Sequence, residues 1–503
     1  MMGCKLAFIF TAITLGTSFQ FGYHTGVINQ PLNLISDFIR DVTISRGGSQ
    51  DDAYTTTMVS ICVTTWLVGG MIGGIFGGFI ANKFGRKRSI IYLSFPCLLG
   101  CLLMMTCKVA GSFEMLIVGR LFVGLACGAY TAVGPMYLAE LAHPSSRGAA
   151  GVLNQLVTAG SLLFSQVLAM PIVMSTEQLW PILLGLSCIP CVISVVCLLF
   201  CPESPRYLFL IKNDPVSAQE VLLRLRGPSS DVQAELDGMS RESEAVTRKA
   251  RVLDLWHVPH LRLALVIAIV AQMGQQLSGI NGIFYYSVKL FESNGLSPDQ
   301  ANYASIGTGG ALFLITLVSI FIIDRTGRRV LLIGGLIVAF FCLIIFTGCM
   351  IGKTLGEVQW PAYVAIVVIY VFVCGFGIGA GSIPWFIVAE LFPQDTRDAA
   401  TSVAVLTNWL CNIVVGLGFI QLIKYIGIYS FVPFIIILVF VIGFLIVYLP
   451  ETKGRTPTSI EAELKQILQR RGCRRRTPSF TEFPTTVSEV DATAEDSLKP
   501  AMA

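Results

Sequence analysis

The sequence predicts an all-α membrane protein in which twelve transmembrane helices form two pseudo-symmetric bundles of six, joined by short linker helices. Three observations predict this fold class. The 503 residues are 54% apolar and only 13% charged, with a mean hydropathy of +0.72, whereas about a quarter of the residues in a water-soluble domain are charged. Apolar runs long enough to span a bilayer, which takes about 20 residues, recur along the chain. Charged motifs repeat between the two halves.

We count twelve apolar runs bounded by charged or turn residues. They cover residues 6–28, 57–81, 89–107, 115–138, 149–170, 179–201, 263–290, 303–323, 330–351, 361–389, 399–424 and 428–449. The first run is too long, and too rich in glycine and aromatic residues at its end, for a cleaved signal peptide, so we interpret it as the first span.

The widest interruption, from Pro202 to Arg262, is polar and contains helix-like charged stretches at Ala218–Arg226 and Leu236–Arg251. We therefore interpret it as a linker between two halves. The predicted segments are an N-terminal bundle at 1–205, cytoplasmic linker helices at 206–258, a C-terminal bundle at 259–456 and a cytoplasmic, mostly disordered tail at 457–503.

Orientation follows from the basic residues of the short loops, which concentrate on the cytoplasmic side of membrane proteins. One side of the predicted topology carries Lys83, Arg86, Lys87, Arg88, Arg147, Arg325, Arg328, Arg329 and Arg397. The other side has few, such as Lys108 and Lys353. Both termini are therefore predicted to be cytoplasmic. From Arg470 onward the tail is first basic and then rich in Ser, Thr and acidic residues, without apolar periodicity, which predicts disorder.

The two halves repeat each other at an almost constant offset. The loop at 82–87 (NKFGRK) recurs at 324–329 (DRTGRR), and Pro202-Glu203-Ser204 recurs as Pro450-Glu451-Thr452. The pair Glu140 and Arg147 recurs as Glu390 and Arg397. Parallel repeats with a site between them are a design of alternating-access transporters. We predict a cytoplasmic ion-pair latch formed by Arg86, Glu140, Arg147, Arg328, Glu390 and Arg397.

The predicted spans contain almost no charge at mid-membrane depth, with Arg120 the clearest exception, but many carboxamides. These are Gln20, Asn154, Gln155, Gln166, Gln272, Gln275, Gln276, Asn281, Asn408 and Asn412. A carboxamide both donates and accepts hydrogen bonds, as sugar hydroxyls do, whereas an ionic substrate requires a countercharge. A single buried carboxamide is explained by helix packing; four in the seventh span favour a site for a neutral, polyhydroxylated ligand.

Two spans are predicted to break where this ligand binds. On a straight helix Gln276 and Asn281 point about 140° apart, so one face cannot present both, and we expect the seventh span to break near Ser278-Gly279. Four glycines between positions 375 and 381 weaken the tenth span just before Trp385. Unwound segments at mid-membrane depth are tolerated where they line a cavity. We expect Trp385 to lie against the C–H face of a sugar.

Other functional classes find little support in the sequence. The net charge of +4 is too small to indicate nucleic-acid binding, and most of the fifteen cysteines lie inside apolar runs as small buried side chains. The segment from Gly348 to Thr354 resembles a phosphate loop but is one residue short. His257 and His260 lack companion ligands for a metal. We expect no enzyme activity, no metal and no cofactor.

Taken together, several motifs resemble the sugar-porter branch of the major facilitator superfamily, and within it the animal facilitative glucose transporters. They are Gly78 with the 83–87 loop, Gly119-Arg120, Glu140 with Arg147-Gly148, the 202–206 motif (PESPR), the 275–281 motif (QQLSGIN), Ile383-Pro384-Trp385 and the 450–455 motif (PETKGR). The resemblance covers about residues 6 to 456 and implies the major facilitator fold.

The resemblance also implies the site. In that family the positions matching Gln155, Gln275, Gln276, Asn281, Trp385 and Asn408 line the central sugar site, Phe284 and Tyr285 lie near its outer lid, and Phe376 and Trp409 add aromatic wall. The chain departs from the glucose carriers at three places. Leu312 replaces a usual asparagine, Gly377 a usual glutamate, and Gln272-Met273-Gly274 a Gln-Leu-Ser sequence. Losing hydrogen-bond partners relaxes selectivity, so we expect glucose, mannose and galactose all to compete.

The function implied is facilitative uniport of glucose and related hexoses across the plasma membrane by alternating access. A proton-coupled sugar symporter remains an alternative, because His24 stands where uniporters have asparagine and symporters aspartate; we expect His24 not to couple protons. A non-transporting sugar sensor is a further alternative. In the tail, Ser479 and Thr477 follow an arginine cluster, which indicates either a kinase site or a patch that binds anionic lipid.

Overall fold

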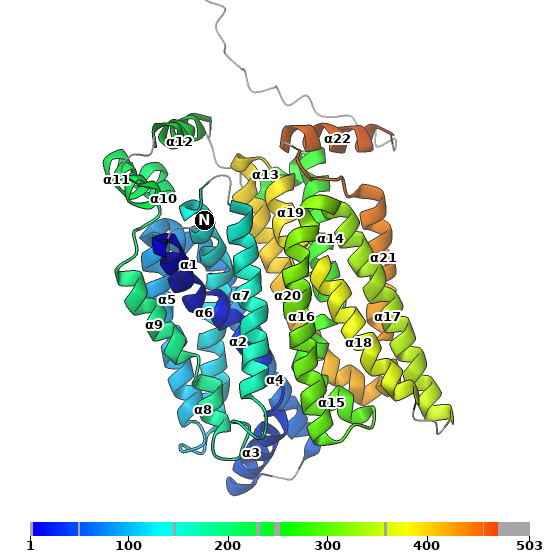
Figure 1. Ribbon diagram of the computed structural model, residues 1–503. Helices are drawn as coiled ribbons and strands as arrows, with labels where there is room; N and C mark the ends of the chain where they lie inside the picture. Colours follow the sequence, from blue (N-terminus) through cyan, green and yellow to red (C-terminus); the bar gives the residue numbers. More distant parts are fainter. Residues whose placement is uncertain are drawn as a thin grey trace, which may run out of the picture.

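The computed structural model describes residues 4–48, 51–143, 147–227, 232–245, 252–356, 360–455 and 457–470. Within these ranges all regular secondary structure is helical (Figure 1). Eleven helical segments are long and apolar enough to cross a bilayer, and a twelfth, Val432–Tyr448, is apolar and 17 residues long. The chain is therefore a multi-pass membrane protein, as the sequence predicts.

The N-terminal half contains both continuous and interrupted spans. Its helices are α1 (Cys4–Gly16), α2 (Ser18–Gly26), α3 (Leu32–Ser45), α4 (Asp52–Phe84), α5 (Arg86–Thr106), α6 (Phe113–Leu141), α7 (Arg147–Leu168), α8 (Trp180–Gly185) and α9 (Cys188–Leu199). The first span breaks at Thr17, whose backbone (φ −123°, ψ −82°) is not helical. The sixth span is also split, between α8 and α9. The sequence analysis predicts neither interruption.

Helix α3 is a further element that the sequence analysis does not predict. Its buried residues are Leu32, Ile35, Ile39 and Val42, which recur every three or four positions, so a helical periodicity was present in the sequence. The helix packs on α4 and α6, and Arg46 just beyond it pairs with Glu114 at the start of α6.

The linker between the halves is helical, as expected. It comprises α10 (Pro205–Leu210), α11 (Pro215–Arg226), α12 (Gln233–Ala245) and α13 (Val252–His257). A small apolar cluster of its own, which includes Ala218, Leu222 and Leu236, holds the first three helices together. Arg226 donates hydrogen bonds to the Leu141 oxygen at 2.9 Å and to the Ala142 oxygen at 3.1 Å. The linker therefore caps the end of α6.

The C-terminal half repeats the pattern of long and broken spans. Its helices are α14 (Pro259–Gln276), α15 (Ile280–Ser293), α16 (Pro298–Thr326), α17 (Arg328–Gly356), α18 (Trp360–Ile378), α19 (Ile383–Leu391), α20 (Gln394–Ile426), the short 3₁₀ turn η2 (Gly427–Tyr429) and α21 (Val432–Tyr448). The breaks between α14 and α15 and between α18 and α19 fall where the sequence predicts them.

The first 14 residues of the predicted tail form one more helix, α22 (Pro457–Arg470). Ile460 and Leu464, one turn apart, are fully buried, and α22 contacts α14 and α19. His260 Nε2 of α14 lies 3.0 Å from Glu461 Oε1 of α22. An amphipathic face thus docks this segment on the C-terminal half. Residues 471–503, including Ser479 and Thr477, lie outside the described residues.

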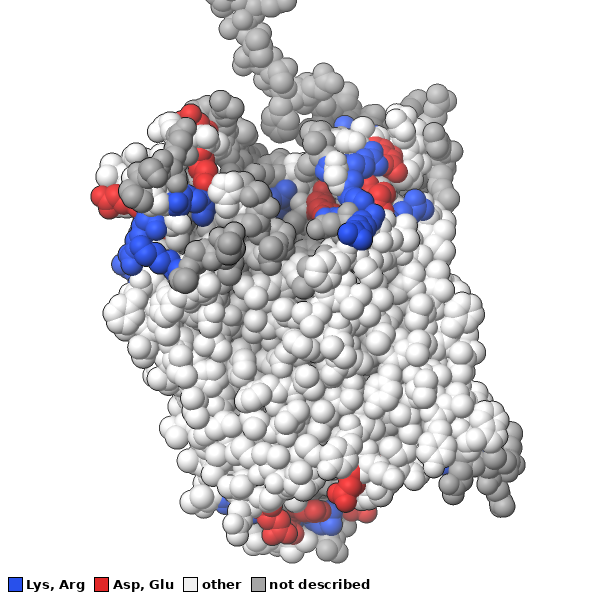
Figure 2. Space-filling view, in the orientation of Figure 1, with Lys and Arg blue, Asp and Glu red and all other residues white. Residues whose placement is uncertain are grey.

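On the face shown in Figure 2, charged side chains lie only at the two ends of the molecule. Lys, Arg, Asp and Glu gather beside the linker helices, at what we call the linker end, and beside α3, at what we call the far end. The band between them is uncharged on the face shown, as expected for a surface in contact with lipid hydrocarbon. The two halves meet in a seam along α4 with α20 and α7 with α16.

Candidate functional site

The break between α14 and α15 sets the geometry of the polar centre. Gly279 has φ +87°, a left-handed conformation that glycine adopts without a Cβ penalty. The Ser278 hydroxyl donates to the Gln275 oxygen at 2.7 Å and so satisfies a carbonyl freed at the helix end. The break places Gln276 at the end of one helix and Asn281 at the start of the next. The side-chain amide of Asn281 donates a hydrogen bond to Gln276 Oε1.

Asn408 of α20 connects the glutamines of α14. Its Nδ2 donates to Gln272 Oε1 and to Gln275 Oε1, both at 2.6 Å, and its Oδ1 accepts from Gln276 Nε2 at 2.9 Å. Gln275 Nε2 in turn donates to the Ala380 and Gly381 oxygens at 2.7 and 2.9 Å. These carbonyls belong to the break between α18 and α19. The unwound backbone of the tenth span is therefore stabilised by a side chain of the seventh.

The same network extends toward the far end. Asn281 Nδ2 donates to Asn412 Oδ1 at 3.0 Å, and the Tyr285 hydroxyl donates to the same oxygen at 3.3 Å. Gln272, Gln275, Gln276, Asn281, Asn408, Asn412 and Tyr285 thus form one hydrogen-bonded group, which we call the carboxamide network. Its polar side chains carry no formal charge, so it can exchange hydrogen bonds with hydroxyl groups without requiring an ionic ligand.

The N-terminal half contributes α7 to the seam. Asn154 Oδ1 accepts a hydrogen bond from Ser18 of α2 at 2.5 Å, and Gln155 beside it is half-buried. All residues from 151 to 158 are half-buried, whereas Ser161, Leu162 and the side chains at 165 and 166 are buried. The polar side chains in the linker-end part of α7 are therefore more accessible than those farther along, where only apolar side chains such as Phe164 and Val167 are exposed.

The far end of the seam is closed by polar contacts between the halves. Asn29, just after α2, donates to Ser287 of α15 at 2.5 Å and to Ser305 of α16 at 3.0 Å. The hydroxyl oxygens of Ser287 and Ser305 lie 2.7 Å apart and share a hydrogen bond. These three residues and Tyr286 are at most 2% exposed. The seam is thus closed at the far end, beyond the carboxamide network, in this conformation.

The predicted aromatic residues divide into two groups. Trp385 in α19 is half-buried, and Phe376 and Phe284 are buried near the breaks of the tenth and seventh spans. Trp409 instead lies in the seam, 5.9 Å from Trp66 and 6.0 Å from Phe21 between ring centroids. It fills a slot on α4 left by two glycines, since a Cβ at Gly70 would overlap the indole ring. Its placement shows that Trp409 packs the two halves together.

His24 and Arg120 are fully buried in the N-terminal half. His24 Nε2 lies 2.8 Å from the Ser187 hydroxyl, and Arg120 Nη1 donates to the His24 carbonyl oxygen at 3.4 Å. The Arg120 guanidinium also stacks on the Trp66 ring at 5.5 Å. In the described part of the chain no carboxylate lies within 4 Å of Arg120.

The repeated motifs form matching ion pairs at the linker end. Arg86 Nε lies 2.8 Å from Glu140 Oε2, and Arg328 Nε lies 3.2 Å from Glu390 Oε1. Glu140 also accepts from Ser204, as Glu390 does from Thr452. Each pair joins helices of the same half. The side chains therefore meet as the sequence predicts, but the contacts hold helix ends within a bundle and do not cross the seam.

Two further acids complete the repeat. Glu203 Oε1 accepts from the Arg86 amide at 2.8 Å, and Glu451 Oε1 accepts from the Arg328 amide at 2.8 Å. Each carboxylate thus caps the helix that begins with the paired arginine. Of the remaining predicted latch residues, Arg397 donates to the Phe392 oxygen at 3.3 Å, and the side chain of Arg147 lies outside the described residues.

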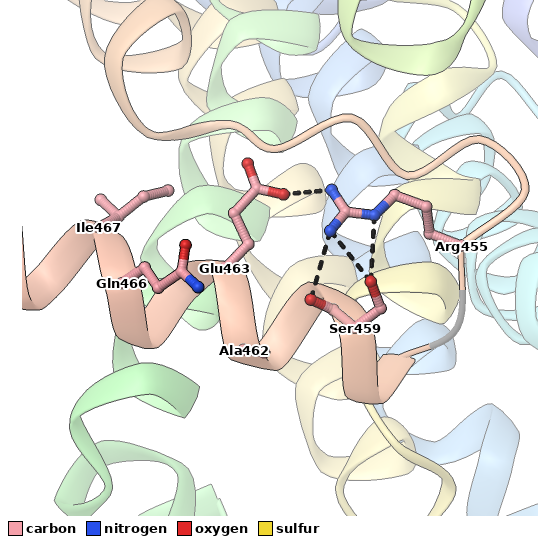
Figure 3. Close-up of a pocket in the computed structure, with 6 residues that line it drawn as sticks. All are labelled: Arg455, Ser459, Ala462, Glu463, Gln466 and Ile467. Atoms are coloured by element: carbon pink, nitrogen blue, oxygen red, sulfur yellow. Dashed lines mark hydrogen bonds and ion pairs between the residues drawn. The ribbon is translucent and has the colours of Figure 1, made fainter.

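A pocket of about 400 Å³ lies beside α22 and is separate from the carboxamide network (Figure 3). Arg455 pairs there with Glu463 and donates to the Ser459 hydroxyl at 3.0 Å. The pocket is lined by Arg455, Ser459, Ala462, Glu463, Gln466 and Ile467. Its charged groups already satisfy each other, so the arrangement anchors the 450–455 motif to α22.

Gln272 and Asn412 are among the carboxamides of the predicted spans, but neither is predicted from the sequence to line the site. Both belong to the carboxamide network in the structure. Helical spacing was the available signal, because Gln272 precedes Gln276 by four residues and Asn412 follows Asn408 by four, which places each pair on one helix face.

Comparison with known proteins identifies the family. The family described as "Sugar (and other) transporter" matches residues 9–464. The chain belongs to this family. It is 41% identical to facilitated glucose transporter member 3 of Ovis aries over 454 residues, covering 90% of this chain and 91% of that protein. It is equally 41% identical to member 1 of Gallus gallus over 452 residues, covering 89% and 91%. As a member of a transporter family, it is not an enzyme.

The fold agrees with this assignment. The structure of the proton:xylose symporter XylE bound to 6-bromo-6-deoxy-D-glucose matches with a TM-score of 0.74 at 24% identity, covering 92% of this chain and all of that one. A partially occluded inward-open form of XylE from E. coli matches with a TM-score of 0.75 at 24% identity, covering 90% and 99%. The predicted major facilitator fold, with two six-helix bundles, is confirmed.

Proposed function

We propose that this protein is a facilitative uniporter that carries glucose and related hexoses by alternating access. The observation that carries the proposal is the carboxamide network at the two helix breaks, which offers neutral donors and acceptors from Gln272, Gln275, Gln276, Asn281 and Asn408. Uncharged groups of both kinds match sugar hydroxyls. The names of the relatives, facilitated glucose transporters, support the same substrate class.

The substrate-binding residues of the proposal are those predicted from the sequence, including the half-buried Gln155 of α7 in the other half. Trp385 supplies an aromatic surface for the sugar's C–H face, and Tyr285 with Phe284 closes the site toward the far end. Gln272 and Asn412 join this set, because they share hydrogen bonds with its members.

Sidedness and location belong to the same proposal. We place the linker end in the cytoplasm, with both termini there, because the basic loops gather at that end, and we place the protein in the plasma membrane. The ion pairs Arg86–Glu140 and Arg328–Glu390 then keep each bundle rigid at its cytoplasmic end while the halves rock. The boundaries at residues 205, 258 and 456, and a kinase or lipid partner for the tail, remain proposals from the sequence.

The test is sugar counterflow in proteoliposomes. We expect labelled D-glucose to enter vesicles preloaded with unlabelled glucose, with mannose and galactose as competitors and fructose a weaker one. Imposing a pH gradient should not drive accumulation above equilibrium. Absence of counterflow at native protein density would contradict transport and favour a sensor.

A proton-coupled symporter is the second candidate, and His24 is the observation that favours it, because a buried histidine beside Ser187 and Arg120 replaces a non-titrating residue. We expect His24→Asn to transport as the parent does, since either side chain can hydrogen-bond to the Ser187 hydroxyl. Accumulation driven by a pH gradient and abolished in His24→Asn would establish the symporter instead.

A further inference from the structure

Two glutamines outside the carboxamide network, Gln30 and Gln166, lie at the far end of the seam. Gln166 is fully buried and Gln30 is 8% exposed. Gln30 Nε2 donates to the main-chain oxygen of Gln166 at 3.2 Å, so the Gln30 side chain lies against the backbone of Gln166. Within the described structure, Gln30 Oε1 and both polar atoms of the Gln166 carboxamide have no hydrogen-bond partner.

The Gln166 carboxamide points into the seam between the halves. A Cβ at Gly309 of α16 would overlap Gln166 Oε1, so the side chain occupies space that this glycine leaves open. Gln166 follows Gln155 on α7 by 11 residues, which corresponds to about 20° around the helix and about 16 Å along it. The two glutamines therefore lie on one face of α7, Gln155 near the centre of the membrane and Gln166 toward the far end.

Burying an amide without partners is destabilising, and native structures rarely do so without a reason. Both side chains are neutral and offer donors and acceptors, as the carboxamide network does. When the seam opens at the far end, the same atoms become the polar groups that a sugar meets before it reaches Gln155.

We propose that Gln30 and Gln166 form an outer subsite that hydrogen-bonds hydroxyl groups of a neutral polyhydroxylated ligand in the conformation open to the far end. The subsite rests on the proposed hexose transport and extends it, because it predicts recognition of ligands longer than one sugar unit. A single hexose is too short to span the distance of about 16 Å that separates Gln155 from Gln166 along α7; a chain of linked sugars can occupy both places.

The experiment uses intact cells that express the full chain, with linear α-1,4-linked glucose oligomers of one to four units added outside as inhibitors of labelled glucose uptake. Gln30→Leu and Gln166→Leu remove the polar atoms and keep the bulk, and Gln166→Asn keeps a carboxamide. Gln178→Leu, in an exposed loop at the far end, is the matched control. Surface labelling normalises each variant for the amount of protein in the membrane.

For both Leu variants we expect the inhibition constants of the three- and four-unit oligomers to rise about three- to tenfold, as loss of one hydrogen bond implies, while that of the monomer changes less than twofold. Gln166→Asn should lie between Gln166→Leu and the parent, and Gln178→Leu should match the parent. A change by the same factor for every oligomer would overturn the proposal, because a shifted conformational equilibrium scales all ligands bound from outside equally.

Unchanged constants, or a parent protein that takes up glucose but is not inhibited by the longer oligomers, would also overturn the subsite. Lack of glucose uptake by the parent would instead refute the proposed function. The two failures therefore give different results.

Discussion

Asn408 is the residue whose removal should damage the site most, because it joins three glutamines at once. In Asn408→Ala, Gln272 and Gln275 each lose a donor at 2.6 Å and Gln276 loses an acceptor at 2.9 Å. Each bond contributes about 0.5–1.5 kcal/mol net. Loss of one to three such bonds weakens hexose binding by roughly 0.5–4.5 kcal/mol, which corresponds to about a two-fold to a two-thousand-fold rise in Kd.

We expect a value inside this range and not at its lower limit, because the glutamines that lose Asn408 also lose their fixed orientation toward the ligand. The assay is equilibrium binding of D-glucose to the purified full chain, followed by isothermal titration or by the change in total tryptophan fluorescence. Asn302→Ala is the matched control. Asn302 is 7% exposed, Asn408 is 4% exposed, and the Asn302 side chain donates to the Pro298 oxygen at 2.8 Å, away from the network.

The control variant should keep the parent's Kd. If Asn408→Ala binds glucose as tightly as Asn302→Ala, with both proteins folded by thermal unfolding in detergent, the network does not hold the sugar and the site assignment is wrong. Equal losses in both variants would attribute the effect to general destabilisation of the C-terminal half.

Three further outcomes follow from the structure. Glu140→Gln should lower the free energy of unfolding by about 3 kcal/mol, since Arg86 and Glu140 are only 7% and 11% exposed and removing one partner leaves a buried charge. Glu390→Gln should lower it less, because Arg328 and Glu390 are 19% and 27% exposed. Equal shifts of the thermal unfolding midpoint in the two variants would contradict this. Leu312→Asn should increase the preference for glucose over galactose and mannose by about two- to tenfold in competition assays, since it restores a hydrogen-bonding side chain. Leu312 Cδ1 lies 3.3 Å from a Cβ built at Gly377, so the two departures from the glucose carriers adjoin each other. Unchanged competition would show that Leu312 does not determine selectivity. Hydrogen bonds from the hydroxyl and, to a lesser extent, the backbone amide of Ser217 hold the pKa of Asp214, at the start of α11, below its usual value. The ionised Asp214 therefore stabilises the folded state above the unfolded-state pKa near 4. This stabilisation is lost as the pH falls through the lower folded-state pKa. The protection factors of the α11 amides against hydrogen exchange, corrected for the intrinsic rate at each pH, should therefore fall below about pH 4, and Asp214→Ala should remove that dependence.

Much of the fold was determined by the sequence alone, because the bilayer imposes a simple rule. Spans must be apolar, helical and about 20 residues long, so composition and periodicity identify them even in a single sequence. Breaks at Gly279 and before Trp385 were predictable for the same reason: a left-handed glycine and a glycine-rich stretch leave local signals. The repeated motifs predicted a group of charged residues at this end, but not the pairs Arg86–Glu140 and Arg328–Glu390, which the structure gives.

What the sequence did not determine are contacts between residues far apart in the chain. Gly16 directly precedes the break at Thr17, but Gly22 and Gly26 of the same span lie inside α2, so a glycine alone does not locate the break. Trp409 and Trp385 are both tryptophans inside apolar spans, and nothing in the sequence separates their roles. In the structure Trp409 packs against the glycines of α4. Whether an ion pair stays within a bundle, and which carboxamides share hydrogen bonds, depends on how α14, α15 and α20 are placed around the breaks. Those placements arise from packing among side chains hundreds of residues apart, and only the tertiary structure decides them.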